Sequence, residues 1–177
     1  MPQICIISGR SLLILGGEIE KQYSIVTQTN KEVMAILPLL LCANSVMKMA
    51  CPEIYNEMVQ TDRDFRLAGT CFTMGAVNSS DCTLHRDYGK GLDILMYGGD
   101  FIGGELCVPQ LGIKVLLQKG DLVILDSRLF HEVLRFYHSR YSIVFFAKPH
   151  HKISKKKNTL EVPEDLKWLS KENFSLF

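Results

Sequence analysis

The chain has 177 residues, enough for a single domain with a sizeable core. Hydrophobic residues make up 47% and charged residues 22%, which is typical of an ordinary soluble globular protein. The formal net charge of +1 excludes a surface that attracts polyanions as a whole, so any contact with nucleic acid needs a local basic patch.

The cysteines and the apolar runs indicate an intracellular protein. The six cysteines are scattered, without a C-x-x-C pair or zinc-finger spacing, and we expect free thiols in a reducing compartment. The apolar run 4–15 is interrupted by polar residues and follows no basic region, unlike a secretory signal. The run 33–43 contains Pro38 and is too short to span a bilayer. The sequence therefore predicts a soluble protein of the nucleus or cytoplasm, with no membrane partner.

The N-terminal third is predicted to hold short strands followed by helices. The apolar runs 4–7 and 12–15 flank a turn and are typical of strands. Asn30 can cap a helix that Pro38 is expected to interrupt or kink. Pro52 stands at a suitable first position for a second helix.

From Phe65 onward the pattern changes to short strands separated by glycine. The predicted strands are 69–77, 92–97, 105–108, 113–117, 121–125, 131–136 and 141–147. The predicted turns are 98–100, 103–104, 111–112 and 119–121. Many short strands at regular spacing favour a sandwich or barrel, and the preceding helices are expected to pack on one sheet.

Three residues among these strands can bind a metal. His85, Asp87 and His131 supply two imidazoles and a carboxylate, the facial triad that holds non-haem Fe(II) and leaves coordination positions open. Zn, Mn or Ni would also bind such a set. His85 and Asp87 are two residues apart, so in an extended segment both point to one side, and His131 must come from another strand. A lone His or Asp on a β protein is usually a surface or hydrogen-bonded residue.

Arg140 and Ser142 follow the triad and are also two residues apart, on the last predicted core strand. An Arg fork binds a carboxylate bidentately, and a Ser hydroxyl adds a further donor. The simplest anionic co-substrate beside an oxygen-activating iron is 2-oxoglutarate. The five residues in this order favour a metal site over unrelated surface roles. His138 is expected to lie in the turn before Arg140 with a structural role.

His85-Arg86-Asp87, the segments 103–106 (Gly-Gly-Glu-Leu) and 119–121 (Lys-Gly-Asp), His131 and the segment 140–146 together resemble the Fe(II)/2-oxoglutarate-dependent dioxygenases. The resemblance covers about residues 65–148. It implies a mainly β fold, with a double-stranded β-helix (jelly-roll) core supported by an N-terminal helical segment. We expect a single dioxygenase domain composed of N-terminal strands and helices (1–60), the core (65–148), and a basic stretch and tail (149–177).

The same resemblance implies the cofactors Fe(II), 2-oxoglutarate and O2. His85, Asp87 and His131 would ligate the iron. Arg140 with Ser142 would bind the distal carboxylate of 2-oxoglutarate, and Asn78 is a weaker candidate for a contact with it.

Within this superfamily, His85-Arg86-Asp87 and the segment 138–146 are similar to the TET/JBP group and its short fungal relatives. Those proteins oxidise methylated bases in DNA, mainly 5-methylcytosine or thymine. The resemblance implies methylated DNA as the substrate, a flipped-out base, and hydroxylation of a methyl group by a ferryl oxidant with release of succinate and CO2. The alternatives are a protein (prolyl-type) hydroxylase of the same superfamily and a catalytically silent metal-binding jelly-roll module.

Further residues are candidates for contacts with the substrate. Arg86 and Tyr88 lie beside the metal ligands, where Tyr88 can stack on a base, although a packing or rim role is an equal alternative. The lysines of the basic stretch can contact phosphates or can form a solvated charge run: Lys155, Lys156 and Lys157. The oligomeric state is left open.

Overall fold

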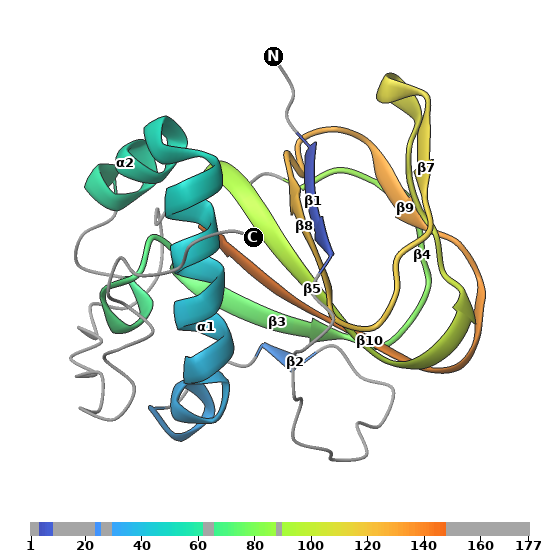
Figure 1. The fold of residues 1–177 in the computed structure, drawn as a ribbon, viewed down its shortest axis with the longest axis horizontal. Helices are drawn as coiled ribbons and strands as arrows, with labels where there is room; N and C mark the ends of the chain where they lie inside the picture. The colour runs from blue at the N-terminus through green and yellow to red at the C-terminus, as the bar shows by residue number, and fades with distance from the viewer. Residues whose placement is uncertain (1–3, 9–23, 26–29, 62–65, 88–89, 148–177) are drawn as a thin grey trace.

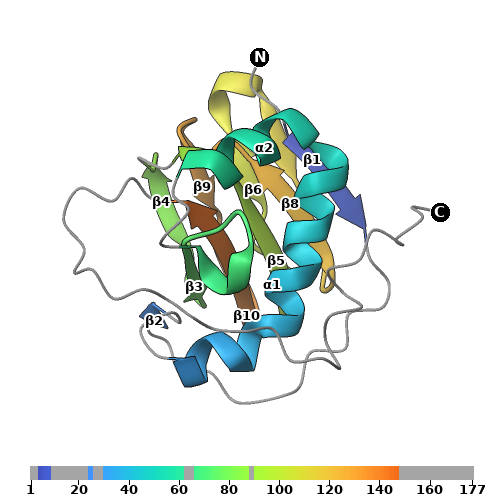
Figure 2. The same ribbon diagram turned by 90° about the vertical axis from the view of Figure 1, so that its left-hand side faces the viewer.

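The computed structural model describes residues 4–8, 24–25, 30–61, 66–87 and 90–147. Two antiparallel β-sheets face each other, and two helices cover the outer face of the larger sheet (Figures 1 and 2). The helices are α1 (Asn30–Ala50) and α2 (Pro52–Thr61), with 3-10 turns at Leu67–Gly69 and Pro109–Leu111. The strands are β1 (Ile4–Ser8), β2 (Ser24–Ile25), β3 (Met74–Asn78), β4 (Cys82–His85), β5 (Lys90–Gly103), β6 (Leu106–Val108), β7 (Ile113–Val115), β8 (Asp121–Leu125), β9 (His131–Val133) and β10 (Phe136–Ala147).

The strand order confirms the predicted double-stranded β-helix. The larger sheet has the order β1-β8-β5-β10-β3-β2 and the smaller one β4-β9-β6-β7. From β3 onward the chain passes back and forth between the sheets and gives four strands to each, while β1 and β2 extend the edges of the larger sheet. The fold is therefore mainly β, with a jelly-roll core preceded by two helices.

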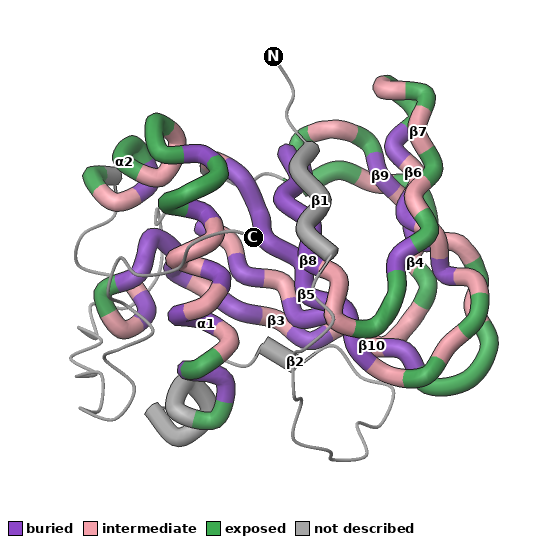
Figure 3. The backbone as a smooth tube through the Cα atoms, in the orientation of Figure 1, coloured by how far each residue is buried: buried purple, intermediate pink, exposed green. Residues whose placement is uncertain are grey.

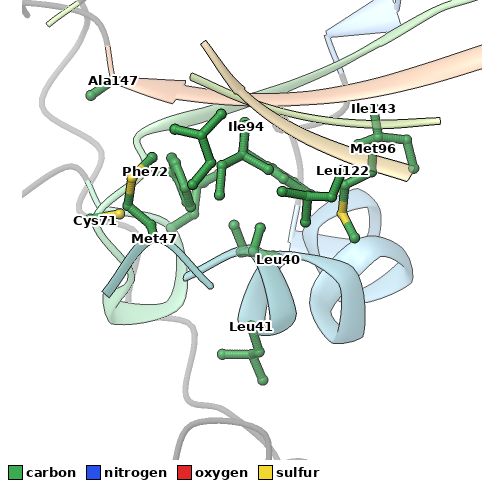
Figure 4. Packing of buried hydrophobic residues seen from close by; sticks show 14 of the residues in the cluster. Leu40, Leu41, Met47, Cys71, Phe72, Ile94, Met96, Leu122, Ile143 and Ala147 are labelled. Carbon is green, nitrogen blue, oxygen red and sulfur yellow. The ribbon is translucent and has the colours of Figure 1, made fainter. Parts of the chain in front are cut away.

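The central part of the larger sheet is buried on both faces. Along β5, Ile94 and Met96 pack toward the helices, whereas Leu95 and Tyr97 face the smaller sheet, as the two-residue alternation of a strand requires. Leu40 of α1 points toward Ile94 in the helix-side cluster (Figure 4). In Figure 3, β8 and residues 92–98 of β5 are almost entirely buried, whereas β7 lies at the surface. Most residues of the hydrophobic run 92–97 thus pack either against the helices or between the two sheets.

Of the two effects predicted for Pro38, an interruption or a kink of the helix, helix α1 shows the interruption to be wrong. Pro38 does not interrupt the helix, which continues from Asn30 to Ala50, whereas Pro52 begins α2 as expected. A proline inside a helix costs about 3 kcal/mol. On either side of it, Leu37 and Leu40 are fully buried against the sheet, and each such side chain contributes roughly 1.5–3 kcal/mol. Burial of this apolar face outweighs the hydrogen bond lost at the proline.

The predicted turn at 98–100 is also wrong, because β5 continues through it to Gly103 along β10. A side chain at Gly98 would collide with the ring of Tyr141, and one at Gly99 with the backbone carbonyl of Ser139. These glycines allow two strands to approach closely rather than reverse the chain.

Two further predictions concern His138 and the N-terminal apolar runs. His138 lies inside β10 rather than in a turn, with a φ of 71°. Of the two N-terminal apolar runs, 4–7 falls in β1, which pairs with β8, and 12–15 lies outside the described residues.

None of the helices in the described part of the chain is long and apolar enough to cross a membrane.

Candidate metal centre and anion site

The three predicted metal ligands lie together at one end of the smaller sheet. His85 is the last residue of β4, a strand that the sequence analysis missed, and it lies directly opposite His131, the first residue of β9. The two imidazole centroids are 4.3 Å apart, and Nε2 of His131 is 4.0 Å from Oδ2 of Asp87. One ligand atom from each of the three residues lies within 4.8 Å of the others, so a single metal ion can contact all three.

Both histidines keep Nε2 available as the metal-binding nitrogen. Nδ1 of His85 is 2.8 Å from the carbonyl of Thr83, and Nδ1 of His131 is 2.9 Å from the carbonyl of Leu129. A carbonyl can only accept, so each Nδ1 carries the proton and each Nε2 keeps its lone pair for a metal. Burial lowers the pKa of His131, which favours the neutral imidazole that metal binding requires.

The loop that carries His131 is braced against Asp87. The backbone N–H of Asp87 donates to the carbonyl of Ser127 over 2.8 Å. In the same loop, Arg128 donates two hydrogen bonds of 2.7 Å to the carboxylate of Asp126. These bonds hold the pKa of Asp126 below its usual value. The two segments that supply the triad are therefore held together before any metal binds.

Arg140 on β10 is the second unusual residue of this region. It is 2% exposed, and its guanidinium carbon lies 4.9 Å from the ring centre of Tyr97, 5.3 Å from that of Phe136 and 5.7 Å from that of Phe101. None of its three side-chain nitrogens has a hydrogen-bond partner among the described residues. Buried polar groups are almost always paired, so a guanidinium held in this way fits an anionic ligand.

The pairing of β5 with β10 builds this aromatic cage. Arg140 lies opposite Gly99, and the side chains of Tyr97 and Phe101, two residues to either side, share its face of the sheet. An added Cβ at Gly99 would collide with the backbone of Ser139 and Arg140, so this glycine allows β10 to approach β5 closely where the guanidinium lies near both rings. Cation–π contacts of about 0.5–2 kcal/mol each offset part of the cost of burying the charge.

Tyr97 is a functional candidate that the sequence analysis missed. It is 1% exposed, and its hydroxyl has no hydrogen-bond partner in the described part of the chain. Burial raises its pKa to about 12 against the opposing charge of Arg140, so the hydroxyl stays protonated and can donate. Tyr97 lies in an apolar run, and only the pairing with β10 places it beside Arg140.

A substitution at Gly104 tests the aromatic cage around Arg140 without replacing any of the cage residues. Its φ is +72°, and an added Cβ would lie 3.0 Å from Cδ and Nε of Arg140. We expect Gly104→Ala to displace the guanidinium and to weaken 2-oxoglutarate binding roughly tenfold, which corresponds to about 1.4 kcal/mol. The measurement is a calorimetric titration of the metal-loaded protein.

Gly112 provides the matched control for that variant. It has a similar φ of +64°, but a Cβ there meets nothing within 4 Å. Both alanine variants should lose about 1–2 kcal/mol of stability from the left-handed backbone. Equal 2-oxoglutarate affinity in the two variants would show that contact with Arg140 does not matter for binding.

A cavity of about 200 Å³ is bordered by most of the predicted metal and co-substrate residues. It is lined by all three triad residues, by Ser142 and Asn78, and by further residues of both sheets: Ala76, Cys82, Asp93, Leu95, Leu106, Leu125, Ser127, Val133, Val144 and Phe146. Arg140 does not line it, but it lies two residues from Ser142 on the same face of β10. The hydroxyl of Ser142 is 3.5 Å from the carbonyl of Asn78, to which it donates.

The structure describes only one of the residues predicted to contact the substrate, Arg86. Arg86 is exposed, with its guanidinium carbon 5.4 Å from the ring centre of Phe130, the residue before His131. Phe130 is 40% exposed, so a cation and an aromatic ring flank the triad at the surface. His138 is exposed on β10 and is not part of the triad cluster. Tyr88, Lys155, Lys156 and Lys157 lie outside the described residues.

Comparison with known proteins supports the fold. No protein-family model matches the sequence, and no curated protein matches it either. A solved structure of NgTET1 in complex with 5mC DNA matches with a TM-score of 0.52 and 19% identity over 71% of this chain. The match spans 60% of the NgTET1 chain.

Two further similarities are weaker. A 2OG-Fe(II) oxygenase family oxidoreductase from Burkholderia pseudomallei matches with a TM-score of 0.40 and 20% identity over 49% of this chain and 48% of its own. The viral collagen prolyl hydroxylase of Paramecium Bursaria Chlorella virus-1, solved with 2OG, matches with a TM-score of 0.42 and 12% identity over 73% and 80%. Only the similarity to NgTET1 supports the shared fold.

Proposed function

We propose that this chain is an Fe(II)- and 2-oxoglutarate-dependent dioxygenase that oxidises methylated bases in DNA, with 5-methylcytosine or a similar base as substrate. The observation that carries the proposal is the pair of facing histidines with Nε2 available beside Asp87, in a cavity that is also lined by Ser142, two residues from the buried Arg140 guanidinium, which has no hydrogen-bond partner among the described residues. The domain proposed for this activity is a single domain of residues 1–177, with the jelly-roll core at 65–148.

The donor groups fit the proposed cofactors. His85, Asp87 and His131 would hold Fe(II), because two imidazoles and one carboxylate suit this metal and leave positions open. Arg140 would bind the distal carboxylate of 2-oxoglutarate, helped by the hydroxyls of Tyr97 and Ser142. The cavity is smaller than the roughly 300–1,000 Å³ of pockets for drug-sized ligands, as suits a five-carbon diacid.

Bound iron with 2-oxoglutarate and O2 would supply the oxidant that hydroxylates a methyl group, with release of succinate and CO2. The protein's own contribution is orientation. The Nδ1 bonds to Thr83 and Leu129 aim the imidazoles, and the aromatic cage keeps water from the guanidinium. Apolar side chains such as Leu95 and Val144 surround the space between these two points and limit oxidation to what enters it.

The choice of DNA rests on two supports. The His85-Arg86-Asp87 triplet and the segment 138–146 resemble the TET/JBP group, and the fold matches NgTET1, which was solved with 5mC DNA. At the surface, Arg86 and Phe130 beside the triad offer a cation for phosphate and a ring for stacking. A base in a duplex would have to leave the stack to reach the triad, and the lysines at 155–157 would add phosphate contacts.

The test is succinate release from 2-oxoglutarate with Fe(II), O2 and duplex DNA, followed by mass analysis of the nucleosides. We expect succinate and an oxidised base from methylated DNA and only slow release with the unmethylated duplex. Succinate without base oxidation, together with hydroxylation of a proline-containing peptide, would replace DNA by a protein substrate. A protein that binds neither Fe(II) nor 2-oxoglutarate would overturn the proposal.

A further inference from the structure

An exposed aromatic ring lies at the rim of the candidate metal centre. Of the aromatic side chains in the described residues, only Phe130 and Tyr137 are exposed, at 40% and 66%. Phe130 directly precedes the candidate ligand His131, so the Cα atoms of these two residues are about 3.8 Å apart. A single exposed apolar side chain is common on protein surfaces. Phe130 differs from such a residue in its position beside the triad and in the way it is held.

The pairing of β4 with β9 places Arg86 across from Phe130. His85 lies opposite His131 in this antiparallel pair, so the residue after His85 and the residue before His131 share the next position along the two segments. The guanidinium carbon of Arg86 is 5.4 Å from the ring centre of Phe130. Because side chains alternate between the faces of a sheet, the imidazoles line the cavity while Arg86 and Phe130 lie outside it, at the rim.

The loop that carries Phe130 is held in place before any ligand binds. A backbone hydrogen bond of 3.0 Å closes the turn 126–129, which directly precedes Phe130. The backbone N–H of Asp87 donates to the carbonyl of Ser127 in this turn over 2.8 Å. The cation–π contact with Arg86 adds to the packing that holds the ring. An exposed side chain that is already ordered loses little freedom on binding, which favours contact with a partner.

The proposed substrate needs such a side chain at this place. A base that is paired in a duplex has to leave its stack to bring its methyl group to the triad, and the vacated position costs pairing and stacking energy. Proteins that open or kink duplex DNA commonly insert an apolar side chain, phenylalanine among them, between neighbouring bases. The guanidinium of Arg86 at the same rim suits a phosphate of the same strand.

We infer that Phe130 inserts into the base stack of a DNA duplex at the position vacated by the methylated base, so that the protein acts on paired bases. The inference rests on the proposed function and adds to it the residue that holds the duplex open.

The experiment compares the wild type with Phe130→Ala on two DNAs that carry one 5-methylcytosine, a paired duplex and a single strand of the same sequence. On the duplex, kcat/KM should fall roughly 10–100-fold in the variant, because contact of an aromatic ring with the stacked bases is lost. On the single strand it should change by less than about threefold, because no base pair has to be opened. Phe130→Leu should keep most of the duplex activity, since leucine also serves as a wedge.

Tyr137→Ala is the matched control. Tyr137 is the other exposed aromatic residue, but it lies on β10 opposite Ile102 and does not line the cavity. Its activity on both DNAs should equal that of the wild type. The affinities for Fe(II) and 2-oxoglutarate should be unchanged in Phe130→Ala, which shows that His131 keeps its place. If these affinities fall, Phe130→Thr replaces the alanine variant.

A second readout is independent of turnover. A fluorescent cytosine analogue, whose emission rises when it leaves the base stack, replaces the methylated base in the duplex. The Zn(II)-loaded wild type in the absence of O2 should raise the emission at saturation. Phe130→Ala at saturation should leave the emission close to that of the free duplex.

The outcomes separate this inference from the proposed function. If the wild type oxidises the methylated duplex and Phe130→Ala is equally active, the role of Phe130 is overturned while the dioxygenase proposal stands. An equal loss on the duplex and on the single strand has the same meaning, because it would show a contact other than insertion into the stack. If the wild type binds 2-oxoglutarate but neither binds nor oxidises either DNA, the DNA substrate is wrong, and the inference fails with it.

Discussion

Replacing Arg140 with methionine is expected to stabilise the protein without co-substrate and to abolish its stabilisation by 2-oxoglutarate. The guanidinium is 2% exposed and has no hydrogen-bond partner among the described residues. Replacing buried charges by apolar side chains of similar volume often stabilises proteins by about 1–4 kcal/mol. Methionine fills a similar volume and packs well against the rings of Tyr97, Phe101 and Phe136.

The measurement is thermal unfolding with and without 2-oxoglutarate in the presence of metal. A gain of about 1 kcal/mol raises the midpoint by roughly 2–4 °C in a protein of this size. The wild type should gain about 2.7 kcal/mol at a 2-oxoglutarate concentration 100 times its dissociation constant, and Arg140→Met should gain nothing.

Arg140→Lys is the matched control, because it keeps the charge without the planar fork. It should not show the added stability of the methionine variant and should recover only part of the ligand effect. A methionine variant that is still stabilised by 2-oxoglutarate would mean that another group binds the co-substrate. One that is much less stable than the wild type would show that the guanidinium has a structural role.

Replacing His131 with alanine is expected to remove metal binding while the jelly-roll core stays folded. Loss of a residue that merely orients a ligand typically weakens metal binding 10–100-fold, so loss of a ligand should weaken it by more than about 100-fold. The measurement is anaerobic calorimetric titration with Fe(II), with circular dichroism to confirm the fold.

His138→Asn is the control for that variant. His138 is exposed on β10 and has a positive φ, which asparagine tolerates. Its metal affinity should equal that of the wild type. Unchanged Fe(II) affinity in His131→Ala would remove His131 from the proposed triad, and a loss of affinity in both variants would indicate a different ligand set.

The candidate metal ligands could be selected from the sequence because few residue types bind Fe(II). The two-residue spacing of His85 and Asp87 requires only that the segment be extended. The order of His131, Arg140 and Ser142 along the chain narrowed the prediction further. The sequence could not show that β4 exists or that His85 lies opposite His131, because strand pairing depends on residues far apart in the chain.

Glycine and buried polar residues are where prediction failed, for a physical reason. Gly98 and Gly99 were predicted as a turn, but glycine also appears where two strands must approach closely, and only the partner strand distinguishes these cases. Tyr97 lies at the end of an apolar run that reads as core. Its place beside Arg140 follows from the pairing of β5 with β10, which local sequence does not record.

The sequence by itself determined the fold class and the side chains available: a mainly β chain with two leading helices, a set of side chains that can bind a metal, and an Arg-x-Ser element on the last core strand. The tertiary structure alone decided the geometry that gives these residues a site. The pairing of β4 with β9 brings the histidines together, and the pairing of β5 with β10 encloses Arg140. The chemistry of a side chain is known from its residue type alone. The strand register, in contrast, is set by long-range packing against the faces of the larger sheet.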